Sequence, residues 1–113
     1  MVSLERLQHA AALADTLSFV QAAARMGLSQ SAFSRSIQAL EDELGVELFA
    51  RNNRRVSITD AGLALLEDAR QLIAQAERFA QAAARLSSAM PGAVRMATNP
   101  YAAYVPPPVA MLT

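Results

Sequence analysis

Apolar residues return at seven-residue intervals through the second half of the chain. From residue 62 to residue 86, leucine or phenylalanine alternates with glycine or alanine at the two inward positions of a heptad. This repeat predicts one continuous helix of roughly 28 residues, about 42 Å long at about 1.5 Å per residue. We expect the helix to cover residues 60–89.

The preceding part of the chain is too short to cover a helix of that length. We therefore expect the apolar seam of the helix to contact a second chain or another domain, because soluble monomers rarely expose such a stripe. A helix that packs only on its own head is the alternative. The residues expected at the seam are Leu65, Ala69, Leu72, Ala76, Phe79, Ala83 and Leu86.

Three shorter helices are predicted before residue 60. Helical spacing of apolar residues places the first at about 4–14. A capping box of Ser18 and Gln21 starts the second at residue 19, and Gly27 ends it. The third runs from a Ser29 cap to residue 44, before a second glycine, and its expected buried stripe is Phe33, Ile37, Leu40 and Leu44.

The exposed face of the third helix carries mostly short polar side chains. A face of this kind lets a helix backbone come close to the base edges in a DNA major groove, whereas long side chains would hold it away. A short second helix followed by a tight turn and such a helix is typical of the helix-turn-helix arrangement. A solvent-facing helix that happens to be rich in serine is the alternative. The residues of this face are Gln30, Ser31, Ser34, Arg35 and Gln38.

A small hairpin is predicted after the third helix. Its strands are "ELFAR" (47–51) and "RVSIT" (55–59), and Asn52 and Asn53 form the turn. Three arginines fall within residues 51–55, and this cluster favours contact with phosphates or a minor groove over a merely solvated turn. The fold class is therefore mainly α, with a winged helix-turn-helix head followed by a long dimerisation helix.

Composition gives no indication of catalysis, a metal or a cofactor. The chain has no cysteine, and His9 is its only histidine, which we expect to be structural. The acidic cluster at 41–47 is expected to pair with Arg25 or Arg51. A net charge of zero argues only weakly against nucleic-acid binding, because charge distribution matters more. No signal peptide or membrane-length apolar run is evident, so we expect a cytoplasmic protein without a membrane partner.

A series of short motifs resembles the N-terminal domain of LysR-type transcriptional regulators, over residues 1 to about 90. The chain departs from the family pattern at Ala10, where an aromatic is frequent, and at Leu17, where glycine is frequent. The motifs follow one another as Ser18-Phe19, Ala22-Ala23, Ser29-Gln30, Ser34-Arg35, Leu40-Glu41, Leu44-Gly45, Leu48-Phe49-Ala50-Arg51 and Thr59-Asp60-Ala61-Gly62.

The resemblance implies sequence-specific binding of double-stranded DNA by a homodimer whose long linker helices pair antiparallel. A tetramer is an alternative assembly of the intact protein. A helical dimerisation module that does not bind DNA is the alternative function. Residue pattern and resemblance together predict the DNA-binding set Ser18, Ser29, Gln30, Ser31, Ser34, Arg35, Gln38, Arg51, Asn52, Arg54 and Arg55.

The chain is expected to contain three segments. Residues 1–59 form the winged helix-turn-helix DNA-binding domain, 60–89 the dimerisation helix, and 90–113 the truncated start of a C-terminal effector-binding domain. In the last segment "AVRMAT" predicts a strand, "NPY" a loop and "VPPPVAML" a helix start, with a polyproline linker as the alternative. By resemblance, a small-molecule effector would bind only the intact protein.

Overall fold

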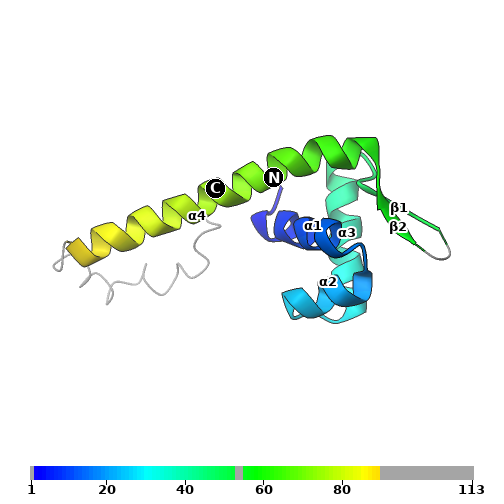
Figure 1. The fold of residues 1–113 in the computed structure, drawn as a ribbon, viewed down its shortest axis with the longest axis horizontal. Helices are drawn as coiled ribbons and strands as arrows, with labels where there is room; N and C mark the ends of the chain where they lie inside the picture. Colours follow the sequence, from blue (N-terminus) through cyan, green and yellow to red (C-terminus); the bar gives the residue numbers. More distant parts are fainter. Residues whose placement is uncertain (1, 53–54, 90–113) are drawn as a thin grey trace. The chain divides into compact units, whose positions relative to one another are not determined.

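The computed structural model describes residues 2–52 and 55–89. Figure 1 shows a mostly helical chain with one two-stranded sheet, as predicted. The strand, loop and helix predicted beyond residue 89 lie outside the described residues. The elements are α1 (Leu4–Thr16), α2 (Phe19–Met26), α3 (Gln30–Leu44), β1 (Phe49–Arg51), β2 (Val56–Ile58) and α4 (Asp60–Ala89).

Serine hydroxyls start the first three helices. The side chain of Ser18 accepts a hydrogen bond from the backbone N–H of Gln21 at 3.1 Å, and Ser29 accepts one from Ala32 at 3.1 Å. Each bond satisfies a backbone donor that has no partner within its helix. Ser3 caps α1 in the same way through Arg6. The predicted serine caps of the second and third helices are confirmed. The reciprocal half of the capping box is not formed, because the backbone N–H of Ser18 donates to Thr16 Oγ1 at 3.3 Å and not to Gln21.

The ends of the helices differ in one respect from the sequence pattern. Gly27 and Gly45 stop α2 and α3 in the left-handed conformation, with φ of 72° and 77°. However, α1 continues to Thr16, two residues beyond the predicted end, and stops at Leu17 with φ of 51°. A leucine in the left-handed region is strained, because its Cβ crowds the following carbonyl oxygen. This is one of the two positions at which the sequence departs from the LysR-type pattern that it resembles.

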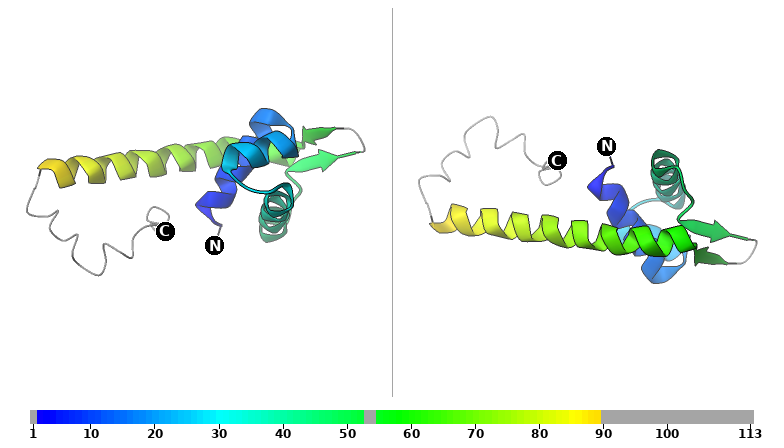
Figure 2. Two further views of the ribbon diagram at one scale, coloured as in Figure 1. Left: turned by 90° about the horizontal axis from the view of Figure 1, so that it is seen from below. Right: turned by 90° about the horizontal axis from the view of Figure 1, so that it is seen from above.

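The core lies where the first three helices meet the start of the hairpin. Phe33, Ile37 and Leu40 of the predicted α3 stripe are fully buried, whereas Leu44 is half-buried. The ring of Phe19 meets that of Phe33 edge-on, with 6.0 Å between centroids. The views in Figure 2 show α1, α2 and α3 gathered together, with the hairpin projecting from them. The largest fully buried side chains are Phe33, Phe49, Leu13, Ile37, Leu40 and Leu48.

The predicted hairpin is confirmed, but its strands are shorter than expected. β1 and β2 are antiparallel and pair Phe49 with Ile58 and Arg51 with Val56. The backbone N–H of Arg55 donates to the side-chain oxygen of Asn52 at 2.8 Å, which stabilises the turn. Asn53 and Arg54 lie outside the described residues.

The first turns of α4 pack closely against the hairpin. Gly62 is buried, and a Cβ at this position would lie 2.2 Å from the carbonyl oxygen of Leu48. The Thr59 hydroxyl accepts a hydrogen bond from the backbone N–H of Gly62 at 2.9 Å and donates to the carbonyl of Glu47 at 2.6 Å. Thr59 therefore ties the start of α4 to the chain segment that leads into β1.

The described chain divides into two compact units, one ending at Ile73 and the other starting at Ala74. In the first unit, Leu66 and Ala69 of α4 belong to the head's own core. These turns therefore pack on the head of the same chain, which was the alternative to a contact with a second chain. Ala69, with 4% of its surface exposed, is not available to a partner. Leu65 is 37% exposed and Leu72 56%.

In the second unit, most of the predicted seam residues face solvent. Phe79 and Leu86 are each 59% exposed, and Ala83 is exposed as well. Ala76 is half-buried. None of the helices described by the structure combines the length and the apolar character needed to cross a membrane.

Candidate nucleic-acid interface

The polar face of α3 is open along its first turns. Gln30, Ser31, Arg35 and Gln38 are exposed, and Ser34 is half-buried. In the described part of the chain Arg35 has no ion-pair partner, so its guanidinium is available to an anion or a base edge. The prediction of an exposed polar face on this helix is confirmed.

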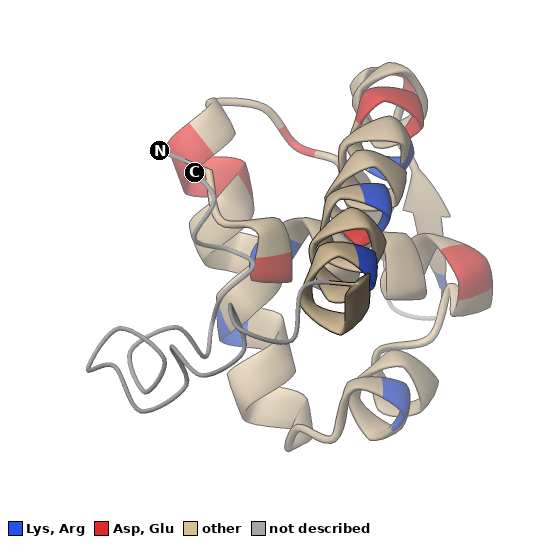
Figure 3. Ribbon diagram, turned by 90° about the vertical axis from the view of Figure 1, so that its left-hand side faces the viewer, with Lys and Arg blue, Asp and Glu red and all other residues tan. Residues whose placement is uncertain are grey.

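Charge divides α3 into two ends. Figure 3 shows acidic residues gathered at the C-terminal end of the helix, away from its first turns. Arg35 is the only charged residue before Glu41 in this helix. The Gln38 amide lies between the two ends and donates to Asp42 at 3.0 Å. A polyanion would therefore meet less repulsion at the N-terminal half of α3, where the helix dipole is also positive.

The arginines of the hairpin have different surroundings. Arg51 lies at the end of β1, 3.7 Å from Glu41 Oε1 and with its guanidinium carbon 4.9 Å from the centre of the Phe19 ring. Arg55 is exposed at the other end of the turn. Asn52 is exposed within the turn, and Arg54 is not among the described residues.

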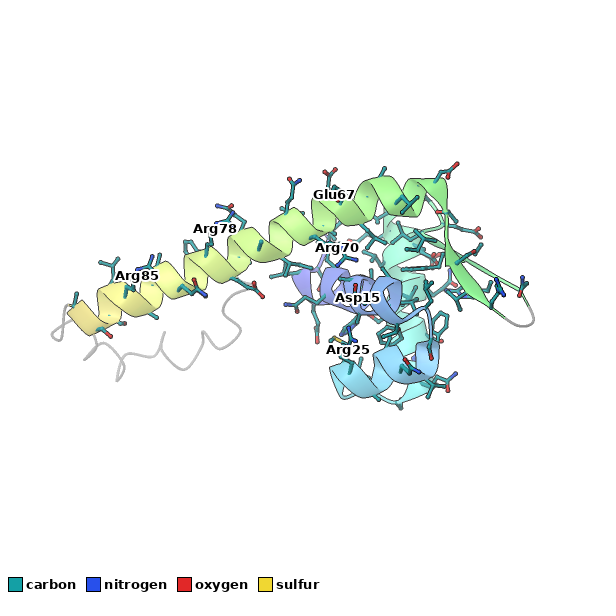
Figure 4. The ribbon with its side chains drawn as sticks, in the orientation of Figure 1. Asp15, Arg25, Glu67, Arg70, Arg78 and Arg85 are labelled. Atoms are coloured by element: carbon teal, nitrogen blue, oxygen red, sulfur yellow. The ribbon has the colours of Figure 1, made fainter. Side chains whose placement is uncertain are left out.

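The acidic cluster pairs with only one of the two expected arginines. Of the two alternatives it is Arg51 that contacts Glu41, which confirms the prediction, whereas Arg25 lies 3.3 Å from Asp15. Asp15 also holds Arg70 of α4, at 3.2 Å. Figure 4 shows Asp15 between the two arginines, so one carboxylate links α1, α2 and the start of α4.

The burial of Glu41 and its contacts with the backbone that enters β1 were missed by the sequence analysis. Only 5% of its surface is exposed, and its Oε2 accepts hydrogen bonds from the backbone N–H groups of Leu48 at 2.8 Å and Phe49 at 3.1 Å. A carboxylate this deeply buried requires such partners. Its spacing was the available signal, because Glu41 follows the buried Ile37 by four residues and therefore lies on the same helix face.

His9 is structural, as the sequence predicted. It is 7% exposed, its Nδ1 lies 2.6 Å from the hydroxyl oxygen of Ser36, and its ring packs near Phe33. Burial lowers the pKa of His9, against the opposing effect of Glu5, and Arg6 lowers it further. Among the described residues no group of three metal-ligating side chains comes together.

Comparison with known proteins gives the context for this geometry. Residues 4–63 match a family model described as "Bacterial regulatory helix-turn-helix protein, lysR family". The chain is 38% identical over 104 residues to the uncharacterized HTH-type transcriptional regulator YnfL of Escherichia coli, which covers 92% of this chain and 35% of that protein. It is 42% identical over 101 residues to the SDS degradation transcriptional activation protein of a Pseudomonas strain, covering 89% and 33%.

Solved structures with the same fold include complexes with DNA. A crystal structure of Vibrio fischeri DarR in complex with DNA superposes with a TM-score of 0.74 and 34% identity, over 78% of this chain and 30% of that one. The CbnR_DBD–DNA complex gives 0.71 and 35%, over 76% and 99%. The chain spans about a third of the length of the curated relatives named above. With the family match covering more than half of its residues, the chain belongs to the LysR family of bacterial regulatory helix-turn-helix proteins.

Proposed function

We propose that this chain binds specific DNA sequences as the dimeric N-terminal module of a bacterial transcriptional regulator. The observation that carries the proposal is the open polar face of α3, which combines Gln30 and the unpaired Arg35 with short serines. DNA complexes of similar chains support it. The chain acts in the cytoplasm by binding, and carries out no reaction.

α3 enters the major groove in this proposal. Gln30 suits an adenine edge, and Arg35 suits a guanine edge or a phosphate, because both side chains can form paired hydrogen bonds. Ser31, Ser34 and Gln38 adjust the approach of the helix. The caps Ser18 and Ser29 place the N-terminal turns of α2 and α3 beside the DNA backbone, where free N–H groups favour phosphate.

The hairpin acts as a wing beside the recognition helix. Arg55 is exposed at its turn, and together with Asn52 and Arg54 it contacts phosphates or a narrow minor groove. Arg51 belongs to the same predicted set, although the structure places it against Glu41. The wing therefore contributes affinity on most sequences, whereas α3 supplies the choice of sequence.

Two copies pair antiparallel through α4. The support is the exposure of the apolar residues that recur along the helix, because covering them removes apolar surface from water. The proposed boundaries are 1–59 for the DNA-binding domain, 60–89 for the dimerisation helix and 90–113 for the start of an effector-binding domain. A small-molecule effector and a tetramer are proposals for the intact protein. The seam comprises Leu65, Leu72, Ala76, Phe79, Ala83 and Leu86.

Selection of bound sequences from a pool of randomised duplexes tests the proposal. We expect an interrupted inverted repeat, because the operator mirrors the two-fold symmetry of the protein. Arg35→Ala should then weaken binding to the selected site by about 1–3 kcal/mol and affect random DNA less. Arg85→Ala removes the same charge from α4 and is the matched control.

Three outcomes are distinguishable. Equal losses on selected and random DNA would restrict Arg35 to backbone contact. Equal losses of DNA affinity in the Arg35 and Arg85 variants would show that the effect comes from the change in net charge. Failure to enrich any sequence, with dimerisation intact, would favour the alternative of a helical interaction module without DNA binding.

A further inference from the structure

Glu41 and Arg51 join the recognition helix to the wing. Glu41 Oε2 accepts the backbone N–H groups of Leu48 and Phe49, where the chain enters β1. Its other oxygen, Oε1, lies 3.7 Å from a terminal nitrogen of Arg51, at the end of β1. Both ends of this short strand are therefore tied to one buried side chain of α3.

Arg51 also contacts α2. Its guanidinium carbon lies 4.9 Å from the centre of the Phe19 ring, and its side chain retains 38% exposure. A planar guanidinium can direct its edge to a carboxylate and its face to an aromatic ring at the same time, which an ammonium cannot do. One side chain thus connects the first residue of α2, the later turns of α3 and the wing.

We propose that Arg51 is a positioning residue, which orients the wing through Glu41 and Phe19, rather than a ligand of DNA phosphate. This inference rests on the proposed DNA-binding function. If Arg51 turned toward a phosphate, the buried Glu41 would lose its cation, and an uncompensated buried charge costs more than an exposed ion pair contributes. Arg55 is under no such constraint, because its side chain has no ion-pair partner in the part of the chain that the structure describes.

The Glu41→Gln variant distinguishes a positioning role of Arg51 from a role as a ligand of DNA phosphate. The glutamine oxygen can still accept both backbone N–H groups, so the link to β1 remains while the charge pairing with Arg51 is lost. For a positioning residue, binding to a mixed-sequence DNA duplex should weaken about fivefold. For a phosphate ligand, the same variant should bind more tightly, because it frees Arg51 and removes a negative charge near the polyanion. The two roles predict changes of opposite sign.

A double variant provides the second readout. Arg51→Gln should cause a much smaller further loss of DNA affinity in the Glu41→Gln background than in the wild-type background, because only the contact with Phe19 remains to be lost. A full loss in both backgrounds would overturn the inference. Affinity is measured by fluorescence anisotropy across a series of NaCl concentrations, well below the melting temperature of each variant.

Lysine substitutions at the two ends of the turn give a matched comparison. Arg55→Lys should retain most of the affinity and the salt slope, because a phosphate contact needs mainly charge. Arg51→Lys should behave like Arg51→Gln, because lysine cannot use a planar edge and face together. Rescue by lysine at 51 would overturn the inference, and this comparison stands even if Arg51→Gln does not fold.

Failure of the proposed function would look different. A wild-type chain whose binding to the duplex shows no salt dependence would refute DNA binding by this surface. Thermal melting of the wild type, the Glu41→Gln and Arg51→Gln variants and the double variant still tests the contact between Glu41 and Arg51 in that case. We expect Arg51→Gln to lower the melting temperature clearly in the wild-type background and much less in the Glu41→Gln background. Equal shifts in both backgrounds would overturn the positioning role.

Discussion

The head and the later turns of α4 differ in the burial of their apolar side chains. Up to Ile73 the chain has its own core, in which Phe33, Leu40 and Leu66 are covered. From Ala74 onward, Phe79 and Leu86 remain exposed despite the same helical spacing. Periodicity therefore identifies the apolar face of a helix, but the length of chain available to cover it decides whether that face becomes core or interface.

Substitution of Gly62, which contacts the hairpin, is expected to destabilise the head most. Gly62→Ala would bring a methyl group to 2.2 Å from the Leu48 carbonyl oxygen, so the start of α4 must move away from β1. We expect a loss of about 3 kcal/mol in the free energy of unfolding, measured by urea denaturation. Gly45→Ala is the control, because a Cβ there meets nothing within 4 Å and only the positive φ is strained. An equal loss in both variants would exclude the steric explanation.

Leu72 tests whether the exposed residues of α4 form an interface. Leu72→Asp should place a charge in the seam and weaken dimerisation at least about tenfold, because a buried unpaired carboxylate is costly. The head should remain folded, since Leu72 is 56% exposed. Sedimentation measures the assembly, and Gln81→Asp, on the outward side of the heptad, is the control. If the wild-type chain sediments as a monomer at high concentration, the exposed residues of α4 do not form a dimer interface.

Acid should lower the free energy of unfolding of the head, because the head contains His9. The helix α4 has no histidine and should show no loss of this kind. The folded-state pKa of His9 is lowered by burial, so the unfolded chain takes up the proton first as the pH falls. The stability from neutral His9 is fully present above the unfolded pKa of about 6.5 and is lost as the pH falls from there toward the folded pKa. Urea denaturation on both sides of pH 6 measures this loss. His9→Gln should show less of it, and an unchanged pH dependence would exclude His9 as its source.

The smallest expected change is a gain in stability at Leu17. Leu17→Gly removes the strain of a left-handed leucine and should stabilise the head by about 0.5–1 kcal/mol, after the greater flexibility of glycine in the unfolded chain is subtracted. Little packing is lost, since Leu17 is 43% exposed. Thermal melting measures the gain. A lower melting temperature would show that the Leu17 side chain contributes more through packing than its conformation costs.

The sequence was sufficient for features that depend on neighbouring residues. Ser18 and Ser29 as caps, Gly27 as a stop and the α3 stripe all follow from local hydrogen bonding and helical period. The α3 members of the predicted DNA-facing set also follow from the helical period, although their contacts with DNA stay predictions. Local rules work here because caps and stripes involve residues within one helical turn.

Most features that join distant segments could not be predicted, although the contact of Arg51 with the acidic cluster was. The burial of Glu41 depends on backbone N–H groups of β1, and Gly62 matters because Leu48 lies against it. Ala69 fits the heptad as well as Ala76 does, yet the head covers only Ala69. No local pattern distinguishes these cases, because tertiary contacts determine them.

The carboxylate that Arg25 and Arg70 share has a consequence for how α4 is attached. Each of the three side chains is roughly half exposed, so dissolved ions compete for these contacts. The apolar attachment through Leu66 and Ala69 is instead strengthened by salts that are excluded from protein surfaces. The start of α4 thus has one attachment that weakens with ionic strength and one that does not. Concentrated salt will loosen the link between α2 and α4 while leaving the helix seated on the core.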